Sequence, residues 1–390
     1  MKILHTVEFY HPSVGGMQEV VQQLSERLVG LGHQVTVATS RLSERNETTL
    51  NGVDIEEFGI SGNLARGMTG EIGRYRQFLL DSSFDVVTNF AAQQWATDAA
   101  ITMLDRISAG KVFVPTGFSG LYDPLYTDYF TSMTGWMKQY DANVFLSDNY
   151  RDINYARENG ITNSVLIPNG ASADEFLSPP AMDIRQQLNI PRDDLLILHV
   201  GTHTGIKGHA EAMRIFSKAD ITNATFLLVA NEMRRGCTRS CRWKSRLFNH
   251  LPSWRRDRKK ILVISLPREE TVAAYQAADL FLFPSNIECS PLVLFECMAS
   301  KTPFLSTVAG NAEEIVRWSN GGVILPTTND AKGYARAEIE TSAVMLGQLA
   351  ADRERRTALA ENGFRAWQER FTWEKIARDY ESLYYSLAKK

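Results

Sequence analysis

Short apolar runs rich in β-branched residues alternate with helical stretches along the whole of this 390-residue chain. Strands that alternate with helices are typical of parallel sheets built from βαβ units, so we predict an α/β fold. Between the first two strands, residues 17–31 predict a helix with one apolar face. The first series of predicted strands covers residues 3–7, 35–39, 53–58, 85–89, 112–115, 144–147 and 165–168. The second series covers residues 195–200, 225–230, 261–266, 280–284, 304–307 and 323–326.

Two series of strands require two hydrophobic cores, and a hydrophobic content of 44% is enough to fill both. Asn169-Gly170 is typical of a turn, and Pro179-Pro180 stiffens the chain shortly afterwards. We therefore predict two doubly wound domains, residues 1–172 and 173–371, followed by a helix over residues 372–390.

The composition excludes several kinds of function. A net charge of −3 excludes a nucleic-acid-binding protein that works through overall basicity. No apolar run approaches the ~20 residues of a membrane span, and residues 1–8 become polar too soon for a signal peptide. We expect a cytoplasmic protein without a nucleic-acid partner, whose four cysteines are reduced.

The segment after the predicted strand 280–284 carries the most informative chemistry. Ser290-Pro291 predicts a new helix, with the serine as N-cap and the proline at the first helical position. Ligands of open α/β sheets bind at the carboxyl ends of strands, and a helix N-terminus offers free N–H groups to an anion. The backbone at Leu292 and Val293 is therefore a predicted phosphate site.

Two glutamates lie close to this predicted helix start. Glu296 is the single acid in an otherwise apolar helix, and a buried carboxylate needs a hydroxyl, an amide or a cation as its partner. A ribose diol would serve, and the alternative is a neighbouring backbone group or arginine. Glu288 lies in the preceding loop, where an acid can equally be just solvated.

The segment resembles the donor-site signature of glycosyltransferase family 4. The residues that carry the resemblance are Phe283-Pro284-Ser285, Glu288-x7-Glu296, Met298-Ala299 and Thr302-Pro303. The resemblance implies that Glu288 touches hydroxyls of the donor sugar, that Glu296 binds the ribose and that the helix N-terminus holds the diphosphate.

Further segments match the same family in order along almost the entire chain. The resemblance implies the GT-B fold, with two Rossmann-like doubly wound domains facing a cleft. It also implies an N-terminal acceptor domain, a C-terminal donor domain, a last helix that crosses back to the first domain, and retention of configuration at the sugar carbon. The further matching segments are residues 11–16, 32–37, 167–170 with 176, 200–201, 207–208, 278–285, and 310 with 314–315.

These matches nominate the residues of a donor site. Gly15-Gly16 lacks side chains, so its backbone can approach a charged ligand closely. Lys207 follows a strand end, where a cation can neutralise a departing diphosphate, although a solvated surface lysine is the alternative. The predicted catalytic residues are Glu288 and Lys207. The predicted donor-binding residues are Gly15, Gly16, Gly201, Thr202, Lys207, Glu288, Ser290, Leu292, Val293 and Glu296.

The predicted reaction is transfer of a hexose from a nucleotide-diphosphate sugar to a hydroxyl of a carbohydrate or lipid-linked acceptor, in polysaccharide or glycolipid assembly. No Asp-x-Asp stands at a strand end to hold Mg²⁺, so we expect catalysis without a metal and without a cofactor. A catalytically silent nucleotide-sugar-binding protein and a GT-B epimerase remain alternatives. A dinucleotide-dependent dehydrogenase is disfavoured because no Gly-x-Gly-x-x-Gly follows the first strand.

The chain departs from the family pattern at three places. Thr202 stands where the family commonly has an arginine, so one cation at the diphosphate is either missing or supplied by His203, His209 or a residue elsewhere. Asn89 and Thr116 stand where a histidine is often found. The loop after Glu288 reads Cys289-Ser290-Pro291 instead of being rich in glycine, which leaves the sugar and the acceptor open.

A basic segment over residues 234–260 reverses the charge of the chain locally, with eleven lysines and arginines against the single acid Asp257. Cations interleaved with tryptophans predict binding to an anionic membrane surface, and therefore a peripheral location at the cytoplasmic face. The alternative is a solvated loop, or one that pairs with acids of the other domain or of a partner. The predicted contact residues are Arg242, Trp243, Trp254, Arg255 and Arg256.

The same segment holds Cys237-x3-Cys241, with His250 nearby. A structural zinc ion takes four ligands, and this segment offers at most three. The sequence therefore predicts no metal site.

Overall fold

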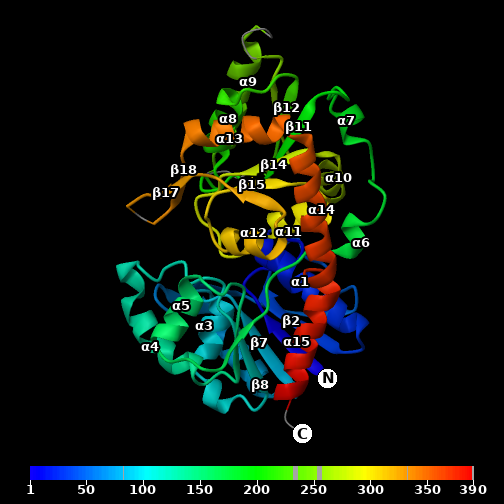
Figure 1. Cartoon of the computed structure of the whole chain (residues 1–390). Helices are drawn as coiled ribbons and strands as arrows, with labels where there is room; N and C mark the ends of the chain where they lie inside the picture. Colours follow the sequence, from blue (N-terminus) through cyan, green and yellow to red (C-terminus); the bar gives the residue numbers. More distant parts are fainter. Residues whose placement is uncertain (82, 232–235, 253–256, 332, 389–390) are drawn as a thin grey trace. The chain divides into compact units, whose positions relative to one another are not determined.

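The computed structural model describes residues 1–81, 83–231, 236–252, 257–331 and 333–388. The chain divides into two compact units (Figure 1). Unit 1 consists of Met1–Asn169 together with Trp373–Lys390, and unit 2 consists of Gly170–Thr372. The sequence-based domain boundaries, between residues 172 and 173 and between residues 371 and 372, lie within three residues of these divisions.

Unit 1 is built on one sheet whose strands run in the order β10-β9-β8-β7-β1-β2-β4-β3. All neighbouring strands are parallel except β3 and β4. The order along the chain reverses between β1 and β7, and such a reversal is where doubly wound sheets bind ligands. The strands are β1 (Lys2–Thr6), β2 (Gln34–Ser40), β3 (Thr49–Leu50), β4 (Val53–Phe58), β7 (Val86–Phe90), β8 (Gly110–Val114), β9 (Ala142–Phe145) and β10 (Ser164–Leu166).

Helices cover this sheet and bury an apolar stripe against it. In α1 the buried residues Val20, Val21, Leu24 and Leu28 recur at helical spacing, as the sequence predicted. A small hairpin of β5 (Ile60–Asn63) and β6 (Gly67–Gly70) forms a separate two-stranded sheet. The main helices of the unit are α1 (Gly16–Gly30), α2 (Ile72–Asp81), α3 (Trp95–Ile101), α4 (Thr127–Met137), α5 (Arg151–Glu158) and α15 (Trp373–Leu387).

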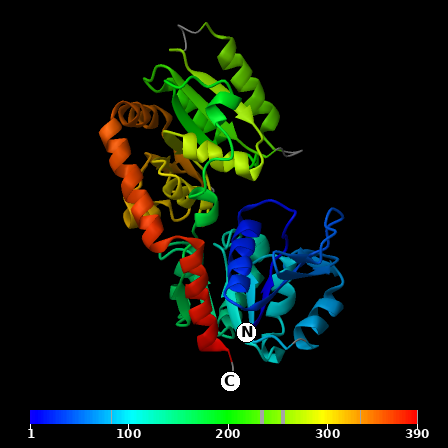
Figure 2. The ribbon, with the colours of Figure 1, turned by 90° about the vertical axis from the view of Figure 1, so that its right-hand side faces the viewer.

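The C-terminal helix α15 packs beside α1 within unit 1 (Figure 2). Arg27 forms an ion pair with Glu374 at 2.8 Å, and His33 Nε2 lies 2.9 Å from Glu381 Oε1. In the core, His5 Nε2 lies 3.1 Å from the hydroxyl of the fully buried Tyr384. These contacts place the last helix of the chain against its first helix and strand.

Unit 2 is built on a six-stranded, wholly parallel sheet with the order β13-β12-β11-β14-β15-β16. In chain order this is the 3-2-1-4-5-6 arrangement of dinucleotide-binding folds, and its reversal lies between β11 and β14. Buried apolar residues pack on both faces of the sheet. The strands are β11 (Leu195–Val200), β12 (Ala224–Val229), β13 (Lys260–Ile264), β14 (Leu280–Phe283), β15 (Phe304–Ser306) and β16 (Gly322–Ile324).

The helices of unit 2 follow its strands in alternation, as the sequence predicted, and the unit ends in a long helical segment. All thirteen predicted strands are present, with ends that differ by at most two residues. The hairpin β17 (Thr327–Asn329) and β18 (Ala335–Ala337) was not predicted, because its strands are short and mostly polar. The helices are α6 (Ala173–Phe176), α7 (Ile184–Gln187), α8 (His209–Lys218), α9 (Thr238–His250), α10 (Arg268–Ala277), α11 (Leu292–Ala299), α12 (Ala312–Ser319), α13 (Ile339–Ala351) and α14 (Arg353–Arg370).

Candidate active site

Two loops meet at the strand reversal of unit 2, one after β11 and one after β14. Gly208 has a positive φ of 70°, and a Cβ at this position would lie 1.8 Å from the carbonyl oxygen of Pro284. Asn286 N–H donates to the carbonyl of Ile206 at 2.9 Å. The two loops therefore touch backbone to backbone, and only glycine fits at residue 208.

The two predicted catalytic residues form an ion pair across these loops. Lys207 Nζ lies 2.7 Å from Glu288 Oε1 and 2.8 Å from Oε2. Ser285 Oγ donates to the same Oε1 at 2.7 Å. The lysine side chain is 26% exposed and the glutamate side chain 10%. The ammonium is thus held at the carboxyl ends of β11 and β14, where it remains partly exposed.

A third loop, after β15, packs against the loop that carries Glu288. Gly310 has a φ of 63°, and a Cβ there would lie 2.9 Å from Glu288 Cβ and 2.5 Å from the carbonyl oxygen of Cys289. Asn311 N–H donates to that same carbonyl at 2.9 Å. The glycine that matched the family pattern is therefore required by close packing against the Glu288 loop.

The helix after this loop begins one residue later than predicted. Pro291, with φ −70° and ψ 111°, is the N-cap of α11, and no side chain caps the helix. The extended ψ of the proline keeps Ser290 too far back to act as the N-cap, so that part of the prediction is wrong. Leu292 and Val293 are the first two helical residues, whose N–H groups have no carbonyl within the helix to bond.

Glu296 has a cationic partner within unit 2. It is 5% exposed, and Arg268 Nη1 donates to its Oε1 at 2.6 Å. Arg268 is the first residue of α10, and it also binds both carboxylate oxygens of Glu175, at 2.7 and 2.8 Å. An arginine was one of the partners predicted for Glu296 in place of a ribose diol, and Arg268 is such a partner for one of the two carboxylate oxygens. Nothing in the local sequence marked Arg268 or Glu175 as part of this site.

The histidine near the carboxyl end of β11 does not supply a cation in place of the family arginine. Gly201 N–H extends the β11 ladder to the carbonyl of Val229 at 3.0 Å, and Thr202 follows it directly. His199 Nδ1 lies 2.7 Å from the carbonyl oxygen of Leu282, and burial lowers the pKa of His199 to about 4. Its imidazole is consequently neutral at neutral pH.

Gly15 and Gly16 lie at the strand reversal of unit 1. Gly15 is extended (φ 177°, ψ 167°) and serves as the N-cap of α1, and Gly16 is the exposed first residue of that helix. The loop before them is fixed by the buried Arg45, which donates to the carbonyls of Tyr10 and His11 at 3.1 and 2.6 Å. The N-terminus of α1 thus offers N–H groups to an anion.

Strained backbone marks the ends of the neighbouring strands β7 and β8 in unit 1. Ala91, Gln93, Thr116 and Phe118 all have positive φ, between 47° and 64°. Such conformations are costly and concentrate at functional sites. Asn89 is buried and binds Thr6 and Tyr140, so it has a structural role where the family often has histidine. The sequence pattern did not reveal this strain.

The predicted membrane-contact residues fall partly on α9. Arg242 and Trp243 are exposed on this helix, with Trp243 63% exposed. Trp254, Arg255 and Arg256 lie outside the described residues. Lys259 is 2% exposed and donates to three carbonyls at the end of α8, so it does not belong to the basic surface. Within the described segments, no helix combines the length and the apolarity needed to cross a membrane.

The fold agrees with the comparisons to known structures. Sucrose-phosphate synthase from Thermosynechococcus elongatus superposes with a TM-score of 0.78 at 19% identity, over 99% of this chain and 98% of that chain. HepE from Anabaena, in complex with UDP-glucose, superposes with a TM-score of 0.74 at 15% identity, over 99% and 100%. Two doubly wound units with this likeness define a protein of the GT-B fold class.

The sequence comparisons then give the family. Residues 14–175 match "Glycosyltransferase Family 4", and residues 181–364 match "Glycosyl transferases group 1". The chain therefore belongs to the family 4-like glycosyltransferases, which confirms the resemblance. A curated relative, D-inositol 3-phosphate glycosyltransferase from Corynebacterium urealyticum, is 35% identical over 121 residues, 31% of this chain. The match spans about a quarter of that relative's length, 26%.

Proposed function

We propose that the protein is a retaining glycosyltransferase that moves a hexose from a nucleotide-diphosphate sugar to a hydroxyl of a carbohydrate or lipid-linked acceptor. The observation that carries this proposal is the Lys207–Glu288 pair at the strand reversal of unit 2, next to the N-terminus of α11. Unit 2 would bind the donor, and unit 1 would bind the acceptor. The complex of HepE with UDP-glucose supports a donor of this chemical class.

In the proposed mechanism, unit 2 stabilises the charge of the leaving diphosphate. As the bond between the anomeric carbon and the phosphate oxygen breaks, negative charge develops on the diphosphate. The Lys207 ammonium and the N–H groups of Leu292 and Val293 would stabilise that charge. Glu288 would hold Lys207 in position and accept hydrogen bonds from sugar hydroxyls, and Glu296 would accept one from the ribose.

The new bond would form on the face from which the diphosphate leaves, which retains the configuration. The acceptor hydroxyl attacks the anomeric carbon, and a phosphate oxygen of the leaving group takes its proton. No protein nucleophile takes part in this scheme, and no Asp-x-Asp carboxylate pair follows a strand to hold Mg²⁺. We therefore propose transfer without a catalytic metal or cofactor.

Nucleotide binding followed by transfer tests the function. A thermal shift with UDP, GDP or ADP at 100 times Kd should add about 2.7 kcal/mol of stability, since the ligand binds only the folded state. Sugars on the nucleotide that binds are then offered with and without an acceptor. Product that requires the acceptor supports the transferase, turnover without acceptor indicates an epimerase, and binding without turnover indicates a silent protein.

The same assay tests the metal-free scheme. Turnover should persist through brief exposure to EDTA, and added Mg²⁺ or Mn²⁺ should not raise it, because Lys207 and the helix N-terminus supply the positive charge. Complete loss of turnover that either ion restores would contradict this scheme.

We further propose that α9 binds an anionic membrane surface at the cytoplasmic face. Its exposed residues include Arg239, Arg242 and Arg246 together with the apolar Trp243 and Leu247. Each cation near such a surface contributes about 1 kcal/mol. This arrangement suits an acceptor that is anchored in the bilayer.

Liposome sedimentation tests this membrane proposal. Wild-type protein should sediment with anionic but not with neutral liposomes at low salt, and binding should fade as added salt shortens the screening length from ~10 Å towards ~3 Å. Replacing Arg239, Arg242 and Arg246 with glutamine should abolish it. The matched triple variant with Arg353, Arg355 and Arg365 replaced, on exposed positions of α14, should bind like wild type. Equal sedimentation of both triple variants, or binding to neutral liposomes, would contradict a specific role for α9.

A further inference from the structure

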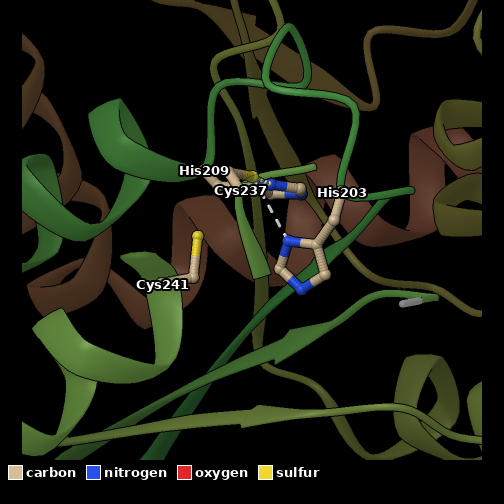
Figure 3. A group of neighbouring side chains, drawn as sticks. All are labelled: His203, His209, Cys237 and Cys241. Carbon is tan, nitrogen blue, oxygen red and sulfur yellow. Dashed lines mark hydrogen bonds between the residues drawn. The ribbon is translucent and has the colours of Figure 1, made fainter. Parts of the chain in front are cut away.

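Four side chains with metal-binding atoms meet beside the Lys207 loop, outside the residues that the proposed mechanism uses. They are His203, His209, Cys237 and Cys241 (Figure 3). One ligand atom from each lies within 4.8 Å of every other. The histidines come from the loop after β11 and from the first residue of α8, and the cysteines come from the N-cap and first turn of α9.

The distances within this group are close to those that a shared metal ion imposes. Cys237 Sγ lies 3.3 Å from His203 Nδ1 and 3.1 Å from His209 Nδ1. Around a tetrahedral zinc ion, with bonds of about 2.3 Å to sulfur and about 2.0 Å to nitrogen, a sulfur and a nitrogen ligand are roughly 3.5 Å apart. The remaining pairs, which lie within 4.8 Å of each other, would need to approach by about 1.5 Å at most, a shift within the reach of side-chain rotation.

Burial and spacing both fit a structural zinc site. His203, His209 and Cys241 are each at most 3% exposed, and Cys237 is half-buried. The spacings Cys237-x3-Cys241 and His203-x5-His209 fall within the ranges of two-cysteine, two-histidine zinc sites, which run from x2 to x4 for the cysteines and from x3 to x5 for the histidines. Two thiolates and two imidazoles fill a tetrahedron, which leaves no open position for catalysis.

We propose that His203, His209, Cys237 and Cys241 bind one zinc ion that fastens α9 to the loop carrying Lys207. This replaces the sequence-based expectation of no metal site, which counted only Cys237, Cys241 and His250. His250 is the last residue of α9, about 14 Å along the helix axis from Cys241, and cannot share their ion. The missing ligands come instead from a segment about thirty residues earlier.

The site would also position the donor loop, a consequence that rests on the proposed function. His203 and His209 enclose Lys207 and Gly208 in the sequence, so one ion would fix both ends of the segment that presents the ammonium to Glu288. The ion would therefore act as a positioning element and would not touch the reacting atoms.

Metal analysis of the full-length protein tests the proposal without any variant. Protein made in zinc-supplemented medium, then freed of loosely bound ions, should retain about one zinc per chain. Exchange for cobalt(II) should give the intense visible bands of a tetrahedral cobalt site with sulfur ligands. A wild-type protein that is folded but holds less than about 0.1 zinc per chain and gives no cobalt spectrum would overturn the proposal.

Variants then assign the ligands. Cys241→Ser and His203→Ala should each lose the zinc and lower Tm, whereas Cys297→Ala and His250→Ala should retain it. Circular dichroism at low temperature shows which variants fold, and only folded variants are compared. Retention of zinc by both ligand variants would overturn the assignment, as would a Cys237–Cys241 disulfide in protein purified under reducing conditions.

The zinc content does not depend on donor binding, so the two proposals fail separately. A protein that holds zinc but binds no nucleotide would contradict only the proposed function. A protein that binds nucleotide and turns over its donor but holds no zinc would contradict only the metal site. If both hold, loss of the ion should raise KM for the donor, because Lys207 is then less well positioned.

Discussion

Replacing Glu288 with alanine is expected to lower kcat by about 10²-fold, the cost of misplacing a catalytic group by about 1 Å. Glu288 holds the Lys207 ammonium through both carboxylate oxygens and is itself held by Ser285. Without the carboxylate, the ammonium loses its fixed position and the sugar loses a hydrogen-bond acceptor. Affinity for the free nucleotide should fall by less than about tenfold, since one hydrogen bond contributes about 1 kcal/mol.

Steady-state kinetics and nucleotide titration measure these two quantities. Glu313→Ala, at an exposed glutamate of α12, is the matched control and should behave like wild type. If the free nucleotide loses affinity by as large a factor as kcat, Glu288 acts on the nucleotide and its assignment to the sugar is wrong. A double variant with Lys207→Ala should lose little more than either single variant, because the two residues act as one unit.

Replacing Glu296 with glutamine is expected to weaken nucleotide binding by about 10- to 100-fold. A hydrogen bond from the ribose to a charged carboxylate contributes about 1.5–3 kcal/mol, and it is lost when the amide turns its NH2 group towards the ribose. The measurement is the Kd of the nucleotide found by the thermal-shift panel. Unchanged affinity in the folded variant would remove Glu296 from the nucleotide site.

The ion pair of Glu296 with Arg268 offers a second explanation for any loss, and one further variant separates the two. Arg268→Ala removes the cation and leaves the Glu296 carboxylate in place. If Glu296 binds ribose directly, this variant should keep most of the affinity, and glutamine at 296 should weaken both backgrounds. If Glu296 only positions Arg268, then Glu296→Gln and Arg268→Ala should each lower nucleotide affinity by as much as the two changes combined.

Much of the fold was predictable from local patterns. Parallel strands that are buried on both faces read as continuous β-branched runs, and the thirteen predicted strands are present for this reason. Glycines at residues 208 and 310 were noted as family matches, and the structure explains them by positive φ and by close approach to other loops. The hairpins of units 1 and 2 were missed because short polar strands carry no periodic signal.

The sequence predicted individual residues of the candidate site, but it did not predict which of them contact one another. Glu288 and Lys207 were both nominated, yet their ion pair joins residues 81 positions apart. Arg268, which binds both Glu296 and Glu175, was missed because a cation at the start of a helix looks like any solvated arginine. The serine N-cap was wrong because the proline after it has an extended ψ.

The sequence alone determined the class of each segment, the strand ends where chemistry could gather and the family to which the donor motif belongs. Only the tertiary structure decided which strand ends are neighbours. The order β13-β12-β11-β14-β15-β16 places the loop after the first strand beside the loop after the fourth, and local periodicity does not encode that order. The same placement brings His203 and His209 to Cys237 and Cys241, because hydrophobic burial of the sheet fixes the loops that carry them.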